Sequence, residues 1–277
     1  MKKKTSIGSW LQGLVVVLVV AVLALYLSQK ARQRGAAAVP SATAVVQPSA
    51  STPSAPQHPI AQAAVPAAAS TAPLPPLDGS DEAVANALVA LAGNGHVRDL
   101  LVSKQLVARI VATIDTLPRR ALGTLMLPAH PPEGAFATAE ADGRITIAAQ
   151  NNDRYTPYIE VMKKVDPAAL VAWYAHAYPL FQQAYQDLGY PHGYFNDRLI
   201  EVIDDLLAAP ELAQPALLQR VKSHYAFVDS SLESLSAGQK LLLRTGSANE
   251  ALIKAKLRAI RAILIGTRLP ASGRSVP

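Results

Sequence analysis

Residues 166–207 read DPAALVAWYAHAYPLFQQAYQDLGYPHGYFNDRLIEVIDDLL and contain two helical patterns separated by a short polar loop. Asp166 and Pro167 fit the cap and the first position of one helix, and Gly189 fits its end. A second helix is expected to begin at Asn196. Apolar residues recur with the helical period at Leu170, Tyr174, Tyr178, Phe181, Tyr185 and Leu188, then at Leu199, Ile200, Ile203, Leu206 and Leu207. This stretch predicts a mostly helical fold.

The same period extends the helical domain over residues 78–277. Further helical patterns lie at residues 78–93, 100–114, 217–227 and 236–246, and a short helix is expected to begin at Pro157. Ser247 and Glu250 have the spacing of a capping box, which predicts that the last helix begins there. Alternation around Asp142-Gly143 predicts a β-hairpin with a type I′ turn in the segment FATAEADGRITI, residues 136–147. We therefore expect an all-α domain with a small β-hairpin insertion.

An uncharged apolar run precedes this domain. Residues 7–27, IGSWLQGLVVVLVVAVLALYL, would span about 31 Å as a helix, which matches the hydrocarbon core of a bilayer. Trp10 and Tyr26 lie near its ends, and basic residues flank both sides. The alternative is a cleaved signal peptide, but the run is longer than a usual signal sequence and basic residues separate it from the nearest cleavage-like site, at residues 36–38. We predict a single transmembrane helix that binds the lipid bilayer, with residues 1–6 in the cytoplasm.

Residues 28–77 form a basic flank followed by a Pro/Ala-rich linker. From Gly35 to Leu77 the chain has nine prolines and no Lys, Arg, Asp or Glu, so we expect the linker to be disordered. It is a passive spacer or, in the alternative interpretation, a docking site for a partner. Such charge-free spacers are common outside the cytoplasmic membrane. We therefore place the domain in the periplasm, on an inner-membrane anchor.

Charge and composition exclude several classes of function. Of the 26 basic residues, six lie in the first 34 positions, whereas all 20 acidic residues lie from Asp78 onward, so the domain itself is neutral and no nucleic-acid partner is expected. The chain has no cysteine, which excludes disulfides, thiol nucleophiles and Cys-ligated metals. The six histidines lack ligand spacing, and no nucleotide-binding or serine-hydrolase motif occurs. We expect no metal and no cofactor.

The segments AYPLFQQAYQDLGYPHGYFNDRLIEVIDDLL (residues 177–207) and LESLSAGQKLLLRTGSANEALIKAKLRAIR (residues 232–261) resemble the bacterial domain-of-unknown-function 3014 family, DUF3014. The likeness extends from about Pro75, through RIVATIDTLPRR and RYTPYIEVMKKVDPAALVAWYAHAYPLFQ. The resemblance implies a single-pass membrane protein with this domain. It implies no activity, and no functional residue is carried over.

Two interpretations fit the aromatic residues that cluster between Tyr155 and Phe195. They form a helix-borne aromatic core, or they line a groove that stacks sugar rings or a peptide. In the second interpretation the candidate binding residues are Tyr178, Tyr185, Tyr190, Tyr194, Phe195 and Arg198.

The polar loop at residues 190–198 suggests a catalytic alternative. Glu201 and Asp205 lie one helical turn apart and would act as acid and base in a glycan hydrolase, with His192 nearby. In the structural alternative, Asn196 or Asp197 caps the helix and Arg198 pairs with Glu201 or another carboxylate.

A basic stretch ends the chain. From Gln239 onward, eight basic residues face only Glu250, which indicates a solvated helix face or a contact with anionic lipid, wall polymer or an acidic partner. Taken together, the sequence favours a non-enzymatic envelope protein that binds a partner protein or a wall component such as peptidoglycan. The envelope glycan hydrolase is the alternative.

Overall fold

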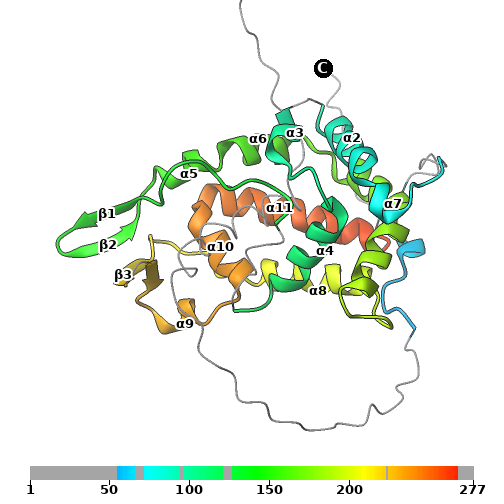
Figure 1. The fold of residues 1–277 in the computed structure, drawn as a ribbon. Helices are drawn as coiled ribbons and strands as arrows, with labels where there is room; N and C mark the ends of the chain where they lie inside the picture. Colours follow the sequence, from blue (N-terminus) through cyan, green and yellow to red (C-terminus); the bar gives the residue numbers. More distant parts are fainter. Residues whose placement is uncertain (1–54, 66–71, 94–95, 121–126, 223, 268–277) are drawn as a thin grey trace, which may run out of the picture.

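The structure, a computed structural model, describes residues 55–65, 72–93, 96–120, 127–222 and 224–267 (Figure 1). Its α-helices are α2 (Asp81–Ala92), α3 (His96–Leu100), α4 (Leu106–Thr116), α5 (Asn151–Arg154), α6 (Thr156–Lys164), α7 (Pro167–Asp187), α8 (Phe195–Leu207), α9 (Ser230–Glu233), α10 (Ala237–Thr245) and α11 (Ser247–Leu264). The strands are β1 (Thr138–Ala141), β2 (Arg144–Ile147), β3 (Leu217–Val221) and β4 (His224–Phe227). Two 3₁₀ helices, η2 (Ile60–Gln62) and η3 (Leu77–Gly79), precede α2. The predicted mostly helical domain with a small β element is confirmed.

The main core is formed by side chains of α2, α3, α4, α6, α7, α8, α10 and α11. α11 contacts α6, α7, α8 and α10, and it crosses the middle of the helical body in Figure 1. The predicted cap of α7 is confirmed, because the Asp166 carboxylate accepts a hydrogen bond from Ala169 N–H at 2.8 Å. α7 and α8 contact each other and are joined by residues 188–194, which we call the α7–α8 corner. This corner carries most of the candidate site residues.

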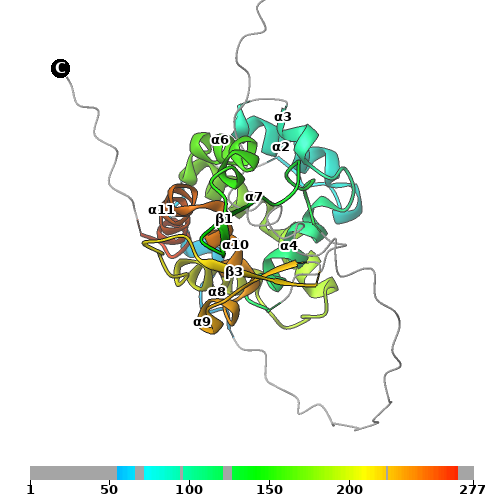
Figure 2. The same ribbon diagram turned by 90° about the vertical axis from the view of Figure 1, so that its left-hand side faces the viewer.

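The four strands form one antiparallel sheet in the order β1-β2-β3-β4, which extends from one end of the helical body (Figures 1 and 2). The hairpin predicted at residues 136–147 is confirmed. Asp142 and Gly143 both have positive φ, 51° and 69°, as a type I′ turn requires, and Ala141 pairs with Arg144 across it.

The helix expected at residues 217–227 is wrong, because this segment forms the β3–β4 hairpin. Its apolar residues fit a helical period, but Val221 is β-branched and Tyr225 and Phe227 are aromatic, and such residues also favour strands. Pairing with β2 decides between the two: Leu218 lies opposite Ile145, and on the other side Leu218 pairs with Phe227. Leu218 and Phe227 then join Leu243 of α10 in a second, smaller core.

The capping box lies one helix earlier than predicted. The Ser236 hydroxyl accepts from Gln239 N–H at 3.1 Å, and Gln239 Oε1 accepts from Ser236 N–H at 3.3 Å, at the start of α10. α11 begins after Gly246 without a side-chain cap. The predicted box at Ser247 is wrong because Glu250 is buried and lies 2.9 Å from Lys254 Nζ in an ion pair.

The helix expected at residues 100–114 is interrupted. α3 ends at Leu100 and α4 begins at Leu106, with Gln105 at a positive φ of 55°. The carboxylate of Asp81, in the first turn of α2, accepts from Gln105 N–H at 2.9 Å and Leu106 N–H at 2.7 Å. A side chain from another helix therefore caps α4, which the local pattern does not reveal.

Only part of the N-terminal predictions can be compared with the structure. No helix in the described ranges has the length and apolar character needed to cross a membrane, and the predicted span at residues 7–27 lies outside those ranges. Within the linker predicted to be disordered, residues 55–65 and 72–77 instead pack on the domain, which corrects the expectation for them. Composition alone misleads here, because a few apolar side chains are enough to order a segment when they pack against the surface of a folded domain. We call residues 55–65 the strap.

Candidate functional site at the α7–α8 corner

Two of the predicted binding residues lie in the core. Phe195 is fully buried and Tyr185 is 6% exposed. The Phe195 ring stacks on Phe181 at 5.8 Å between centroids, and the Tyr185 ring lies 5.6 Å from Phe195. Burial raises the pKa of Tyr185 to about 12, so its hydroxyl stays protonated. These rings form an aromatic core, and a ligand would reach neither Phe195 nor Tyr185 in this conformation.

Tyr178 and Tyr194 are half-buried, at the edge of this core. The Tyr178 hydroxyl donates to Gln182 Oε1 at 2.7 Å. Gln182 also accepts from Phe195 N–H at 2.9 Å and donates to Gly193 O at 2.7 Å. One glutamine of α7 therefore holds the end of the loop and the first residue of α8, with Tyr194 as the N-terminal flanking residue of α8.

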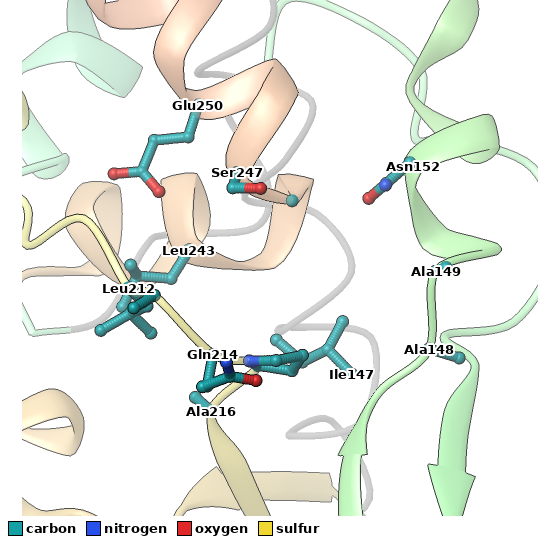
Figure 3. A pocket seen from close by; sticks show the side chains of 13 residues that line it. Ile147, Ala148, Ala149, Asn152, Leu212, Gln214, Ala216, Leu243, Ser247 and Glu250 are labelled. Atoms are coloured by element: carbon teal, nitrogen blue, oxygen red, sulfur yellow. The ribbon is translucent and has the colours of Figure 1, made fainter.

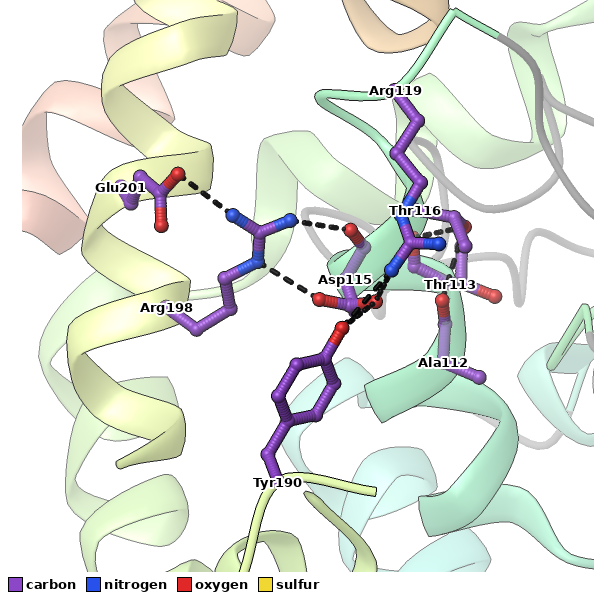
Figure 4. Close-up of polar contacts among 8 residues, drawn as sticks. All are labelled: Ala112, Thr113, Asp115, Thr116, Arg119, Tyr190, Arg198 and Glu201. Atoms are coloured by element: carbon purple, nitrogen blue, oxygen red, sulfur yellow. Dashed lines mark hydrogen bonds and ion pairs between the residues drawn. The ribbon is translucent and has the colours of Figure 1, made fainter. Parts of the chain in front are cut away.

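Asp115, in the last turn of α4, is the centre of a polar cluster that we call the Asp115 hub (Figure 4). It is 2% exposed. Arg198 Nε donates to Asp115 Oδ1 at 3.0 Å, and Arg198 Nη2 donates to Asp115 O at 2.7 Å. Arg119 Nη2 lies 2.5 Å from Oδ2, and the Tyr190 hydroxyl donates to the same oxygen at 3.2 Å. Glu201 Oε1 lies 2.7 Å from Arg198 Nη1.

The hub joins three segments electrostatically. Burial disfavours the charge on Arg198, but the contacts with Glu201 and Asp115 outweigh it and raise the pKa of Arg198. The Tyr190 ring also stacks on Tyr185 at 4.5 Å, which fixes the loop against α7. The predicted pairing of Arg198 with Glu201 is confirmed, and the hub ties the end of α4 to α8 and the loop.

The proposed catalytic carboxylates face different partners. Glu201 has a side chain 64% exposed and pairs with Arg198. Asp205 Oδ2 accepts from the Ser236 hydroxyl at 2.7 Å. Burial raises the pKa of Asp205, against the effect of that hydrogen bond. His192 lies exposed in the loop. None of the three lines the pocket described below.

Asn196 and Asp197, on the first turn of α8, hold the strap, and we call this pair the clamp. Asp197 Oδ2 accepts from Gln57 N–H at 2.9 Å, and Oδ1 accepts from His58 N–H at 2.7 Å. Asn196 Nδ2 donates to His58 O at 2.7 Å. The prediction that one of them caps α8 is wrong, because their side chains bond a segment about 140 residues away.

The rest of the strap lies on α7 and α11. η2 contacts α7, and Ala63 is buried. Ala64 N–H donates to Ile263 O at 2.9 Å, near the end of α11. At Gly266 a Cβ atom would come within 2.8 Å of Gln62 O, so glycine permits this close approach. Figure 1 shows the strap, in blue, beside α7 and the red end of α11. The clamp and these residues together form the strap-binding surface.

Sequence reasoning missed the two residues that organise the corner. Asp115 lies in a helical pattern next to Ile114, where an isolated acidic residue on a buried face was the available signal. Asn196-Asp197 looked like a helix cap, since that is the common use of these residues at a helix start. No local pattern indicates that a carboxylate will accept from N–H groups of a distant linker.

A pocket of about 220 Å³ lies between the end of β2, residues 212–216 and the start of α11 (Figure 3). Glu250 lines it, with Asn152, Gln214 and Ser247. Burial raises the pKa of Glu250, but Lys254 already pairs with its carboxylate at 2.9 Å. In the described residues, His, Asp and Glu side chains form no group of three suited to a metal ion. We assign no ligand to this pocket.

The basic residues from Gln239 onward bond within the domain. Lys254 is 1% exposed and donates to Ala209 O at 2.5 Å, and Arg261 Nε lies 2.5 Å from Asp204 Oδ1. The remaining contacts are those of Lys240 with Glu233, Arg244 with Tyr225 O, Lys256 with Val165 O and Arg258 with Glu211. Arg268 and Arg274 lie outside the described residues. Apart from Glu250, which pairs with Lys254 in the same helix, the acidic partners lie outside this stretch, at Asp204, Glu211 and Glu233.

Comparison with known families identifies one match. The family described as "Protein of unknown function (DUF3014)" matches residues 106–261, which is 156 of the 277 residues. The match runs from the start of α4 into α11, so it includes the Asp115 hub and the clamp but not the strap. No curated protein and no solved structure matches the chain.

Proposed function

The chain belongs to the DUF3014 family, and from the geometry of the α7–α8 corner we propose that its domain binds a partner protein at the strap-binding surface. The family description assigns no activity, so the proposal rests on the site itself.

The observation that carries this proposal is the chemistry of the clamp. Asp197 accepts two consecutive main-chain N–H groups and Asn196 donates to the next main-chain oxygen. Consecutive N–H groups and carbonyl oxygens belong to peptides, whereas sugars present hydroxyl groups. A partner protein therefore suits this surface better than the sugar strands of a wall polymer such as peptidoglycan.

The proposal includes a membrane anchor. Residues 7–27 would cross the inner membrane, residues 1–6 would lie in the cytoplasm, and the domain would lie in the periplasm. The uncharged run of 21 residues and its basic flanks support the anchor, and the composition of residues 35–54 supports the periplasmic side. The anchor would keep the strap-binding surface close to partners of the same membrane.

We prefer binding to glycan hydrolysis because each candidate carboxylate is engaged elsewhere. A hydrolase needs two carboxyl groups that flank one scissile bond. Glu201 pairs with Arg198, and Asp205 accepts from Ser236 of α10. Binding of a partner protein does not require two carboxyl groups to face the same bond.

In-cell crosslinking tests both the binding and the location. Cells that make the full chain would be treated with a membrane-impermeant or a membrane-permeant lysine-reactive crosslinker. We expect the same crosslinked complex with both reagents, recovered from the membrane fraction. In a chain whose strap is released by Ile60→Asp/Ala63→Asp, the clamp variant Asp197→Ala should lower its yield about tenfold, because it removes both acceptors of the partner's N–H groups. The matched control Glu201→Ala alters an exposed carboxylate on the same helix and should leave the yield unchanged.

Each contrary outcome has a definite meaning. A complex that forms only with the permeant reagent would place the domain in the cytoplasm. A yield unaffected by Asp197→Ala in the chain with the released strap would rule out the strap-binding surface, and hydrolysis of a wall glycan without any complex would favour the enzyme.

A further inference from the structure

We infer that the strap-binding surface selects an extended, uncharged peptide with a Pro-x-x-Pro core, and that the strap occupies this surface as a competitor within the same chain. The inference rests on the proposed function and specifies the chemistry of the partner. The strap supplies the evidence, because it is a peptide seated on the surface with every anchoring contact defined.

The spacing of the two prolines in the strap fits the hydrogen-bonding groups of the clamp. Residues 56–60 read Pro-Gln-His-Pro-Ile, and proline has no main-chain N–H. Gln57 and His58 therefore provide the only two N–H groups between the prolines, and Asp197 accepts both. Pro59 has φ −58° and ψ 132°, the polyproline II conformation. A segment already held in this conformation loses less entropy when it binds.

Two apolar positions complete the recognition. Ile60 packs against the main core and Ala63 is buried within it, while Ala64 N–H donates to Ile263 O at 2.9 Å. A charged side chain at position 60 or 63 would lose its hydration against this apolar surface. Residues 55–65 contain no Lys, Arg, Asp or Glu, as such a surface requires.

The x positions are permissive. Asp197 contacts Gln57 and His58 through their main-chain atoms, and the Gln57 side chain is exposed. Different side chains at these positions leave the hydrogen bonds unchanged. The surface would therefore recognise a class of segments, defined by two prolines and the apolar residues after them, and the strap is one member of the class.

Connection to the domain makes the strap a strong competitor. Six residues, 66–71, separate the strap from the next described residue, Ala72. Short connections give an effective concentration on the order of millimolar. If the strap itself binds with an intrinsic dissociation constant of about 50 μM, a partner peptide would then bind the intact chain roughly twentyfold more weakly than a chain whose strap cannot bind.

Peptide titration with the full chain in detergent micelles tests the inference. The probe is a fluorescent peptide of the strap sequence, APQHPIAQAAV, followed by fluorescence anisotropy. The strap variant Ile60→Asp/Ala63→Asp should bind the probe at least about tenfold more tightly than the unaltered chain, because its own strap no longer competes. Adding Asp197→Ala to this variant should weaken binding at least about tenfold. The control Gln57→Ala alters only an exposed side chain and should behave as the unaltered chain.

A second measurement does not depend on the variants folding. In the unaltered chain, hydrogen exchange at Gln57, His58 and Ala64 N–H should accelerate when the probe peptide is in excess, because the displaced strap loses its acceptors. Equal probe affinity of the strap variant and the unaltered chain, no effect of Asp197→Ala, or unchanged exchange at saturating peptide would each overturn the inference.

The two proposals fail separately. An Asp197-dependent complex in cells together with no peptide binding would leave partner binding intact and remove the Pro-x-x-Pro specificity. Peptide binding without any crosslinked complex would show a closed intramolecular site and remove the proposed function.

Discussion

Asp115 shows how one buried charge organises the corner. Its carboxylate is 2% exposed, which is tolerable only because Arg198, Arg119 and the Tyr190 hydroxyl surround it. The Arg198 side chain is itself only 17% exposed. Removing the carboxylate would therefore leave a partly buried guanidinium without one of its two carboxylate partners.

We expect Asp115→Ala to lower the free energy of unfolding by about 3 kcal/mol, the cost of breaking a buried ion pair from one side. Glu201→Ala removes the other partner of Arg198, which is 64% exposed, and should cost less than about 1 kcal/mol. Urea unfolding of the full chain, followed by circular dichroism, measures both. Equal losses would show that the hub does not stabilise the fold through Asp115.

The pKa values of two further carboxyl groups shift in opposite directions. Burial raises the pKa of Asp205 above its ordinary 3.8, and the Ser236 hydrogen bond only partly opposes this. Burial also acts on Glu233, but there the hydrogen bonds from Phe227 N–H at 2.8 Å and Lys240 Nζ at 3.0 Å outweigh it, so the pKa of Glu233 falls below its ordinary 4.5. Ionised Asp205 therefore destabilises the fold and ionised Glu233 stabilises it.

The pH dependence of two isosteric variants should have opposite signs. A raised pKa in the folded state means that stability falls as the pH rises above 3.8, so the advantage of Asp205→Asn over the unaltered chain should grow from about pH 3 to pH 7. A lowered pKa means that stability is lost as the pH falls below 4.5, so Glu233→Gln should be most damaging at pH 7 and nearly neutral at about pH 3. Urea unfolding across this range measures the two differences, and trends of the same sign would contradict the assignment.

At the scale of elements, the start of α10 depends on one serine. The Ser236 hydroxyl accepts from Gln239 N–H and donates to Asp205, which links α10 to α8. Ser247, in contrast, is exposed and provides no side-chain cap to α11. Because the two serines lie at the starts of consecutive helices, substitutions at Ser236 and Ser247 can be compared directly.

We predict that Ser236→Ala lowers the free energy of unfolding by about 1–2 kcal/mol, because both hydrogen bonds are lost. Ser247→Ala should change it by less than about 0.5 kcal/mol. Thermal unfolding of the two variants under the same conditions provides the comparison. A larger loss of stability for Ser247→Ala than for Ser236→Ala would show that Ser247 caps α11, as the local sequence suggests.

The β3–β4 hairpin is an element whose secondary structure could not be predicted from its local sequence. Leu217, Leu218 and Val221 fit a helical period, and nothing within residues 217–227 alone contradicts a helix. The strand conformation depends on β2, which is about 70 residues away and pairs Ile145 with Leu218. By contrast, the β1–β2 hairpin was predictable because its signal, Asp142-Gly143, is contained in the turn.

At the scale of the whole molecule, charges far apart in the sequence neutralise one another. The basic stretch from Gln239 onward contains only one acidic residue, Glu250, yet α11 also meets Asp204 at the end of α8 and Glu211 just after it. The strap reverses another expectation, since a linker without charges finds acceptors on α8 and at the end of α11, and a donor on α8. Both results require elements that only the folded chain brings together.

The sequence predicted the location of the candidate site and one of its ion pairs, but not the roles of its other residues. The sequence pointed to the right corner, because aromatic and polar residues concentrate between Tyr155 and Arg198, and it predicted the Arg198–Glu201 pair. It did not separate the core rings, Tyr185 and Phe195, from the edge residues, since both sets share the helical period. It also did not identify Asp115 or the clamp function of Asn196 and Asp197.

By itself the sequence determined the helical class, the long α7 with its Asp166 cap, the Asp142-Gly143 turn and the family, because each depends on residues within a few positions of one another. The tertiary structure alone decided the β2–β3 pairing, the Asp115 hub and the position of the strap on α8. Those contacts join residues that are 70 to 140 positions apart, and their stability comes from desolvated pairs that a local pattern does not contain.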